Sequence, residues 1–199
     1  MKQILIILLA CVILMSCAIN LCNANEIKET KLETSVGTFI IKGKIAKEGG
    51  TPILKSYPEY YIIVTKGNNK INFYANGTYF PRDIQQDMNK AWSGEEISIG
   101  IFINFLTRAY KAATLNYDDF YKKYYQEYGK GFEIESEMGL HKDESFQERC
   151  KKTYEGYQLN LNKIKVLLGN TPEFPSKLNA LYNDSLKIRK KMKIYLRPL

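Results

Sequence analysis

Hydrophobic residues follow three successive patterns along the chain. Residues 4–15 form an unbroken apolar run. From about residue 36 to residue 80, apolar and polar positions alternate in short segments, which is typical of strands with one buried face. Beyond residue 81 the apolar residues recur at intervals of three and four, the period of an amphipathic helix. The order of these patterns predicts a hydrophobic leader, a sheet and then a set of helices.

The alternating region predicts a meander of three or four antiparallel strands. Its segments are rich in β-branched and aromatic residues, which strands favour. Residues 66–70 and the pair Asn76-Gly77 supply the turn residues that connect neighbouring strands. The predicted strands cover residues 36–45, 60–65, 71–75 and, after the last turn, 78–80.

About five helices follow in the prediction, with their limits set by residues that cap helix ends. Ser93 and Glu96 form a capping-box pattern before the second helix. Apolar residues surround most of that helix, so we expect it to be central and buried. Gly129 should stop the third helix and open a loop over residues 129–142. The predicted helices cover residues 83–92, 93–113, 117–128, 143–168 and 176 onward, with Asn116, Asp143 and Ser176 capping the last three.

These elements predict a single α+β domain. Hydrophobic residues make up 45% of the chain and aromatic residues 13%, which is enough for a packed core. The last two helices carry matched apolar stripes and are joined by a short link, so we expect them to pair as an antiparallel hairpin. Residues 17–33 are polar and predict a tether or the frayed start of the fold. The domain proper would then occupy residues 34–199, with the sheet at 34–80 and the helices at 81–199.

The hydrophobic leader is short for a membrane span and fits a signal peptide. A spanning helix needs about 20 apolar residues, whereas the core of a signal peptide needs about 7–15. At the end of the run, Leu14-Met15-Ser16-Cys17 resembles the lipobox of bacterial lipoprotein precursors. The resemblance implies removal of residues 1–16 and attachment of a diacylglycerol to Cys17. The domain would then be anchored to a membrane of the bacterial cell envelope.

Cleavage after Ala24 is the alternative. Cys22 and Ala24 supply the small residues of an ordinary signal-peptidase site. This alternative would release a secreted or periplasmic protein without a lipid. It needs an apolar stretch that Ser16, Cys17 and Asn20 interrupt, so the sequence favours lipidation.

The chain is basic, with a formal net charge of +8. Such a surface suits anionic lipid, an acidic polysaccharide or an acidic protein partner. Nucleic acid ranks last among partners, because the leader indicates export and no nucleic-acid-binding motif is present. One basic cluster near the C-terminus is either a solvated helix end or a membrane-facing patch. It consists of Lys187, Arg189, Lys190, Lys191, Lys193 and Arg197.

Few residues offer catalytic or metal chemistry, and no cofactor is predicted. His141 is the only histidine, and the sequence contains no nucleotide or cofactor fingerprint. Glu137 and His141 would share a face if helical, which makes them candidates for a divalent metal. The alternative for this segment is a solvated acidic loop. Cys150 lies on the apolar face of its helix, where thiols are usually inert, although a disulfide with Cys22 is conceivable in an oxidising compartment.

Tyrosine is abundant, with 15 residues, and four of them fall on one face of the third helix. Tyrosine side chains are favoured in protein interfaces because they combine a large contact area with a polar tip. They serve equally well to cover the edge of a core. We take these four as the candidate binding surface. They are Tyr117, Tyr121, Tyr124 and Tyr128.

The sequence therefore predicts a lipid-anchored envelope protein with a non-catalytic binding role. A protein or polymer partner would dock on its helical, tyrosine-rich surface. One version of this hypothesis is an inhibitor or immunity protein that neutralises a toxin, and it depends only on size, export and the lack of catalytic motifs. The alternative is an envelope hydrolase that works through scattered carboxylates.

Overall fold

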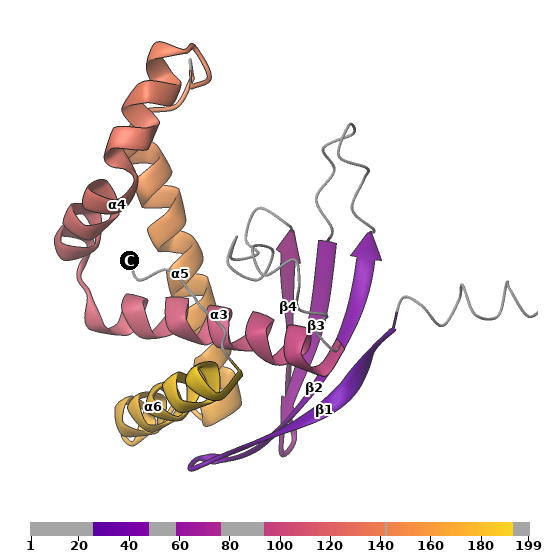
Figure 1. Cartoon of the computed structure of the whole chain (residues 1–199). Helices are drawn as coiled ribbons and strands as arrows, with labels where there is room; N and C mark the ends of the chain where they lie inside the picture. Colours follow the sequence, from indigo (N-terminus) through magenta and orange to yellow (C-terminus); the bar gives the residue numbers. More distant parts are fainter. Residues whose placement is uncertain (1–25, 48–58, 77–93, 142, 193–199) are drawn as a thin grey trace, which may run out of the picture.

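In the computed structural model, a four-stranded antiparallel sheet is followed by helices that cover one of its faces (Figure 1). The structure describes residues 26–47, 59–76, 94–141 and 143–192. The strands lie in the order in which they occur in the chain, so the predicted α+β class and antiparallel meander are confirmed. They are β1 (Glu26–Thr34), β2 (Gly37–Lys47), β3 (Glu59–Lys66) and β4 (Asn69–Asn76).

Alternation along the strands gives the sheet one apolar face. Most inward side chains are fully buried, whereas Thr38, Lys42 and Asn72 point to the exposed face. Strands β3 and β4 are joined by a two-residue turn in which Gly67 has a φ of 56°, a left-handed conformation that glycine adopts without strain. The buried residues of β2, β3 and β4 are Phe39, Ile41, Ile62, Val64 and Phe73.

The predicted tether, residues 17–33, is wrong for residues 26–33, which belong to strand β1, and residues 17–25 lie outside the described residues. Residues 26–33 pair with β2 instead of forming a linker. Leu32 is buried in the core, and the strand is also held by an ion pair of 2.6 Å between Glu29 and Lys42. The alternating charges that suggested a tether lie on a strand at the edge of the sheet, where charged side chains are common.

Helix α3 (Gly94–Thr114) is the central helix, as predicted. It packs on the sheet through Phe102, whose ring lies 5.3 Å from that of Phe39 and 6.2 Å from that of Phe73. Phe105 stacks on Phe73 at 4.7 Å. Other buried positions occur all around the helix, including Ser98 and Thr107, so α3 has neighbours on most of its circumference.

Helix α4 (Tyr117–Glu137) is nine residues longer than predicted, and residues 129–137 are helical instead of forming a loop. Asn116 caps its start as expected, accepting a hydrogen bond of 2.8 Å from the Asp119 amide. Gly129 does not end the helix because it is buried against the ring of Tyr125, where a side chain would collide. Phe132 is also buried and fixes the next turn.

The predicted hairpin of the last two helices is wrong. Helix α5 (Phe146–Leu168) and helix α6 (Phe174–Met192) both direct their apolar stripes at α3, so each packs mainly on α3 instead of on the other. Tyr110 of α3, for example, stacks on Tyr182 of α6 with ring centroids 3.8 Å apart. The expected caps also shift, since Ser145 and not Asp143 caps α5 and since α6 begins before Ser176.

Four helices are described where about five were predicted. The predicted helix 83–92 and the predicted strand 78–80 lie outside the described residues.

The burial of Lys111, in the last turn of α3, should make the free energy of unfolding depend on pH. Burial lowers its pKa from 10.5 to about 8, an effect that Glu127 opposes and nearby cations enhance. Between pH 8 and 10.5 the unfolded chain binds more protons at this lysine, so its contribution to stability rises with pH. The Lys111→Met variant should therefore exceed the wild type in unfolding free energy at pH 7.5 by roughly 1–2 kcal/mol.

Urea unfolding at pH 7.5 and pH 9.5 measures this effect. The advantage of the methionine variant should shrink by roughly 1 kcal/mol at the higher pH. An advantage that stays constant between the two pH values would contradict the burial of a charged Lys111.

Candidate binding surface on the arm formed by α4 and α5

Helix α4 and the first half of α5 form an arm, residues 117–157, that projects away from the sheet (Figure 1). The two helices are joined at the far end by residues 138–145. The sheet makes no substantial contact with α4, whose main partner is α5. The arm is therefore held together by its own side chains, and these decide what its far end can present to solvent.

Aromatic rings fill the interface between the two helices of the arm. Phe120 packs against Tyr154 and Tyr157 with ring centroids 5.1 and 5.2 Å apart. Phe146 lies 5.5 Å from Tyr124 and 5.3 Å from Phe132. Rings in tilted and edge-on arrangements add about 0.5–1.5 kcal/mol per pair to the effect of burial. This aromatic interface, and not the main core, holds the two helices of the arm together.

The predicted tyrosine surface lies along this interface. Tyr117, Tyr121 and Tyr124 are half-buried, and only Tyr128 of the four is exposed. Tyr117 packs edge-on against Tyr154 at 5.5 Å, and burial raises the pKa of Tyr124. Much of the surface offered by these tyrosines is thus used to join α4 to α5.

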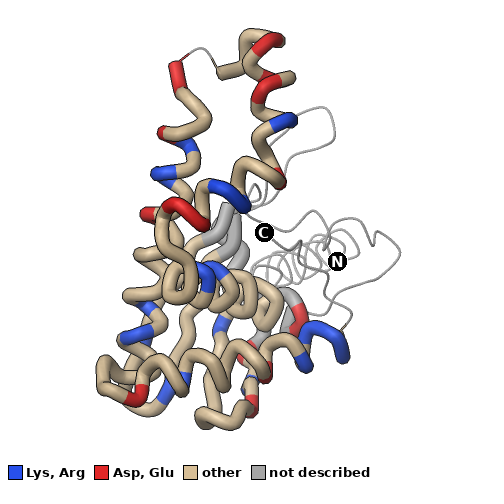
Figure 2. The backbone as a smooth tube through the Cα atoms, turned by 90° about the vertical axis from the view of Figure 1, so that its left-hand side faces the viewer, with Lys and Arg blue, Asp and Glu red and all other residues tan. Residues whose placement is uncertain are grey.

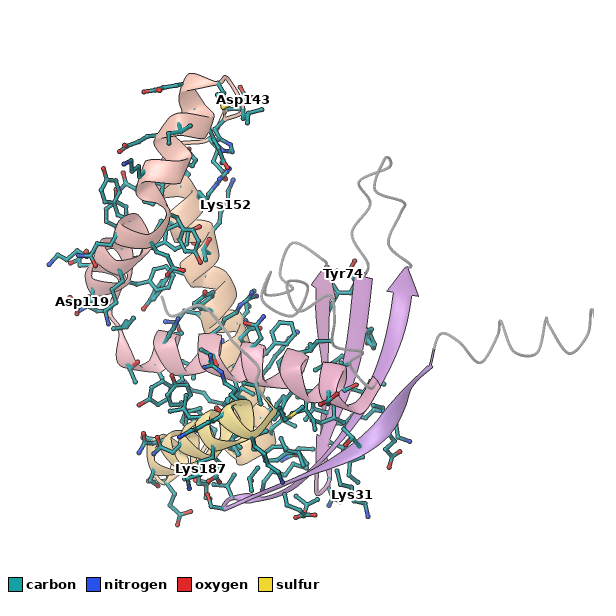
Figure 3. All side chains as sticks on the ribbon, viewed as in Figure 1. Lys31, Tyr74, Asp119, Asp143, Lys152 and Lys187 are labelled. Carbon is teal, nitrogen blue, oxygen red and sulfur yellow. The ribbon has the colours of Figure 1, made fainter. Side chains whose placement is uncertain are left out.

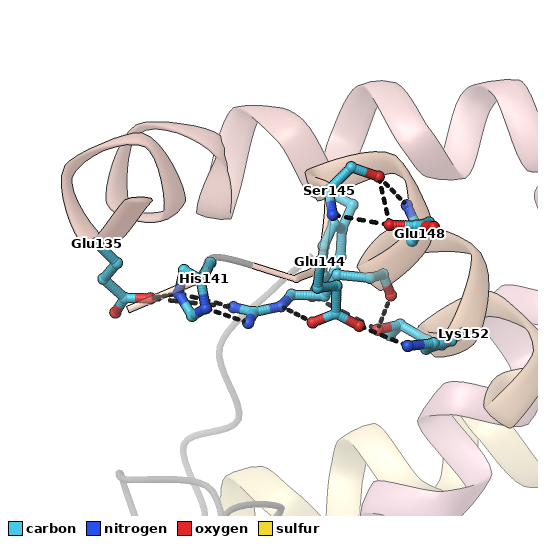
Figure 4. A network of polar contacts seen from close by, with 9 residues as sticks. Glu135, His141, Glu144, Ser145, Glu148 and Lys152 are labelled. Atoms are coloured by element: carbon cyan, nitrogen blue, oxygen red, sulfur yellow. Dashed lines mark hydrogen bonds and ion pairs between the residues drawn. The ribbon is translucent and has the colours of Figure 1, made fainter. Parts of the chain in front are cut away.

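A polar network closes the far end of the arm (Figure 4). His141 contacts Glu135 at 2.6 Å through Nε2 and Arg149 at 2.8 Å through Nδ1. Arg149 also donates from Nε to Glu144 at 3.1 Å, and Glu144 accepts a second bond of 2.8 Å from Lys152. These donors lower the pKa of Glu144, with Lys152 contributing most.

Stacking adds to the same network. The His141 ring lies parallel to that of Phe132 with centroids 4.6 Å apart. The Arg149 guanidinium lies 4.7 Å from the centre of the Phe132 ring. A cation over an aromatic face is attracted by the electrons of the ring. His141 and Arg149 thus tie the connecting segment to both helices, a role that sequence spacing did not reveal.

The structure does not bring the two metal candidates, Glu137 and His141, together on one helical face. Helix α4 ends at Glu137, and His141 follows in the connection, where it pairs with Glu135 instead. Among the described residues, no group of three potential metal ligands converges. Cys150 is a buried free thiol, and burial raises its pKa.

The end of the arm exposes three large apolar side chains that the sequence analysis did not single out. Met138 is 71% exposed, Leu140 is 64% exposed and Ile134 is 51% exposed. Residues 131–145 around them hold five acidic residues and one lysine, a formal charge of −4 in a chain of +8. Figure 2 shows the acidic positions gathered at this end, and Asp143 lies there in Figure 3.

A groove of about 410 Å³ runs along α5 from Glu144 to the base of the arm, where β4 and α3 also line it. Tyr74 and Lys152 line it from opposite sides (Figure 3). Arg108, Arg149 and Lys152 give it three cations against the single carboxylate of Glu144. Two of these cations already bind Glu144, so an anionic ligand would have to compete with that carboxylate.

The predicted basic cluster lies at the end of α6. Lys187 pairs with Asp184 at 3.4 Å, and Lys190 and Lys191 are exposed. Arg189 is half-buried, and burial lowers the pKa of its guanidinium. Lys193, Arg197 and the predicted lipid site Cys17 lie outside the described residues.

The comparisons with known proteins give no family for this chain. No protein-family model matches it, and no curated protein or solved structure shows significant similarity to it. Each helix that the structure describes falls short of the length or apolar content needed to cross a bilayer.

Arg149 should hold the far end of the arm in place. The Arg149→Leu variant removes the charge that joins His141 and Glu144 and leaves Glu144 with Lys152 alone. We expect amide hydrogens of residues 133–145 to exchange at least tenfold faster, and the free energy of unfolding to fall by about 1–2 kcal/mol.

Lys152→Ala is the matched control, because it removes the other cation on Glu144 from a side chain that is 72% exposed. Its effect should stay below about 0.5 kcal/mol. Equal effects of the two variants on exchange would contradict the central role of Arg149.

Proposed function

We propose that this protein is a non-catalytic binding protein of the bacterial cell envelope, anchored through a lipid on Cys17, which docks the end of its arm on a cationic protein partner. The observation that carries the docking part is the exposure of Met138, Leu140 and Ile134 together at a projecting end. Exposed apolar groups that gather within a polar rim mark interaction sites more often than scattered ones do.

The charge around the apolar residues defines the kind of partner. Acidic residues surround the end of the arm in a chain that is basic as a whole. Opposite charges across an interface speed association and exclude wrong partners. A partner with a basic surface is therefore favoured. An enzyme that itself binds polyanions would offer such a surface, which supports the inhibitor or immunity version of the proposal.

The side chains best suited to chemistry are already engaged. His141 is held between Glu135 and Arg149, and both of its ring nitrogens have partners. Cys150 is buried, and its raised pKa disfavours the reactive thiolate. These contacts argue against a catalytic role for His141 or Cys150 and support a binding role.

The anchor part of the proposal is supported by the Leu14-Met15-Ser16-Cys17 unit, which resembles a lipobox. Metabolic labelling with a palmitate analogue tests it. Cys17→Ser should abolish the label and release the protein from the membrane fraction, whereas Cys22→Ser should leave both unchanged. Full labelling of the Cys17→Ser protein would contradict the proposed lipid anchor.

The docking part is tested with a photo-crosslinker placed at position 138 in cells, followed by binding measurements with the purified partner. The partner should be basic. The double variant Met138→Ser/Leu140→Ser should weaken its binding at least tenfold, because the apolar contact is lost.

Val166→Ser/Leu186→Ser is the matched control, since these apolar residues are 49% and 40% exposed away from the arm. Binding should be unchanged in this control. A partner that loses affinity for both double variants alike would argue against docking at the end of the arm.

A further inference from the structure

A small cavity lies within the arm, between α4 and the start of α5. Its volume is about 220 Å³, below the roughly 300–1,000 Å³ of sites for drug-sized ligands, so it suits a chemical group more than a whole metabolite. Aromatic rings make up much of its wall, and charged side chains complete it. The lining includes Tyr124, Glu127, Tyr128, Phe132, Phe146 and Arg149.

Glu127 is the unusual member of this lining. Both oxygens of its carboxylate are buried, and neither has a hydrogen-bond partner among the described residues. Buried polar groups are nearly always satisfied, and an exception calls for a physical explanation. The neighbouring hydroxyl of Tyr128 interacts with this carboxylate, and burial first and then that interaction raise the pKa of the tyrosine, but the contact falls short of hydrogen-bond geometry.

The cations near the cavity do not satisfy Glu127. Arg149 is committed to Glu144 and His141 and lies over the Phe132 ring. Lys111 of α3 and Glu127 of α4 attract each other electrostatically, but the two side chains form no hydrogen bond. The cavity thus combines aromatic faces with a buried carboxylate that accepts no hydrogen bond of good geometry from the described residues.

We infer that this cavity binds an alkylammonium group. An ammonium ion would donate to the Glu127 oxygens, while its alkyl carbons and charge would contact the rings of Tyr124, Tyr128 and Phe146. Carboxylates and aromatic faces both attract such cations, and their effects are stronger where water is excluded. The group can come from a free primary amine or from a lysine side chain of a partner. The inference depends only on the cavity and does not need the docking end of the arm.

Titration of the full-length protein in detergent with butylamine, followed by calorimetry and NMR, tests this inference. Butylamine should bind saturably and shift the signals of Tyr124 and Tyr128. Glu127→Gln should weaken binding at least tenfold, because the amide keeps the shape and loses the charge. Lys111→Met should tighten binding, since it removes a fixed positive charge that acts on Glu127.

Glu137→Gln is the matched control, because it removes an exposed carboxylate from the same helix. Binding should be unchanged in this variant. Sodium chloride at equal ionic strength shows whether charge alone is sufficient, and it should not compete. Thermal unfolding confirms that Glu127→Gln folds.

Two further titrations separate the sources of the ammonium group. Stronger binding of N-acetyl-lysine methylamide than of butylamine assigns the cavity to a partner's lysine, and the reverse order assigns it to a free amine. Equal binding of butylamine to the wild type and to Glu127→Gln, or no saturable binding of either amine, would overturn the inference. The Met138→Ser/Leu140→Ser variant should bind butylamine normally, so a failure of the docking proposal is distinguishable from a failure here.

Discussion

The packing of α3 against the sheet is the contact on which the rest of the structure depends. Phe102 and Phe105 of the helix form one cluster of four rings with Phe39 and Phe73 of the sheet. The other sides of α3 then receive α5 and α6, so one helix joins every layer of the domain. A helix used in this way leaves no free apolar face for α4. Helix α4 has to find its partner outside the main core.

This shortage of core surface explains the construction of the arm. Helix α4 packs on α5 through aromatic rings, and rings cover a large area with few residues. Further from the core the rings give way to polar contacts, and the far end is held by the bonds of Arg149 and His141. Stability should therefore fall along the arm, since networks near the surface contribute less than burial does. A region of lower stability that exposes apolar groups is suited to binding.

The sequence correctly predicted the elements whose limits depend on neighbouring residues alone. Alternation placed β2, β3 and β4, and capping residues placed the start of α3 and α4. Strand β1 was missed because Leu32 is buried in a segment dominated by charge. Helix α4 continues through two glycines because the burial of Phe132 stabilises the helix by more than the glycines destabilise it. Helix propensities read from the sequence do not include this contribution from burial. The prediction of a hairpin was wrong because an apolar stripe shows that a helix packs on a partner but does not show which partner.

The arm combines two features that sequence periodicity could not bring together. Glu127 looks like an ordinary polar helix residue, and its burial arises only when Phe146 and Tyr128 close around it. The apolar end formed by Met138 and Leu140 is exposed because the connection turns outward around the His141 network. A negative charge inside the arm and negative charges at its end act in the same direction. Both favour a cationic surface that meets the arm, and a partner presenting a lysine beside an apolar patch would satisfy the two sites at once.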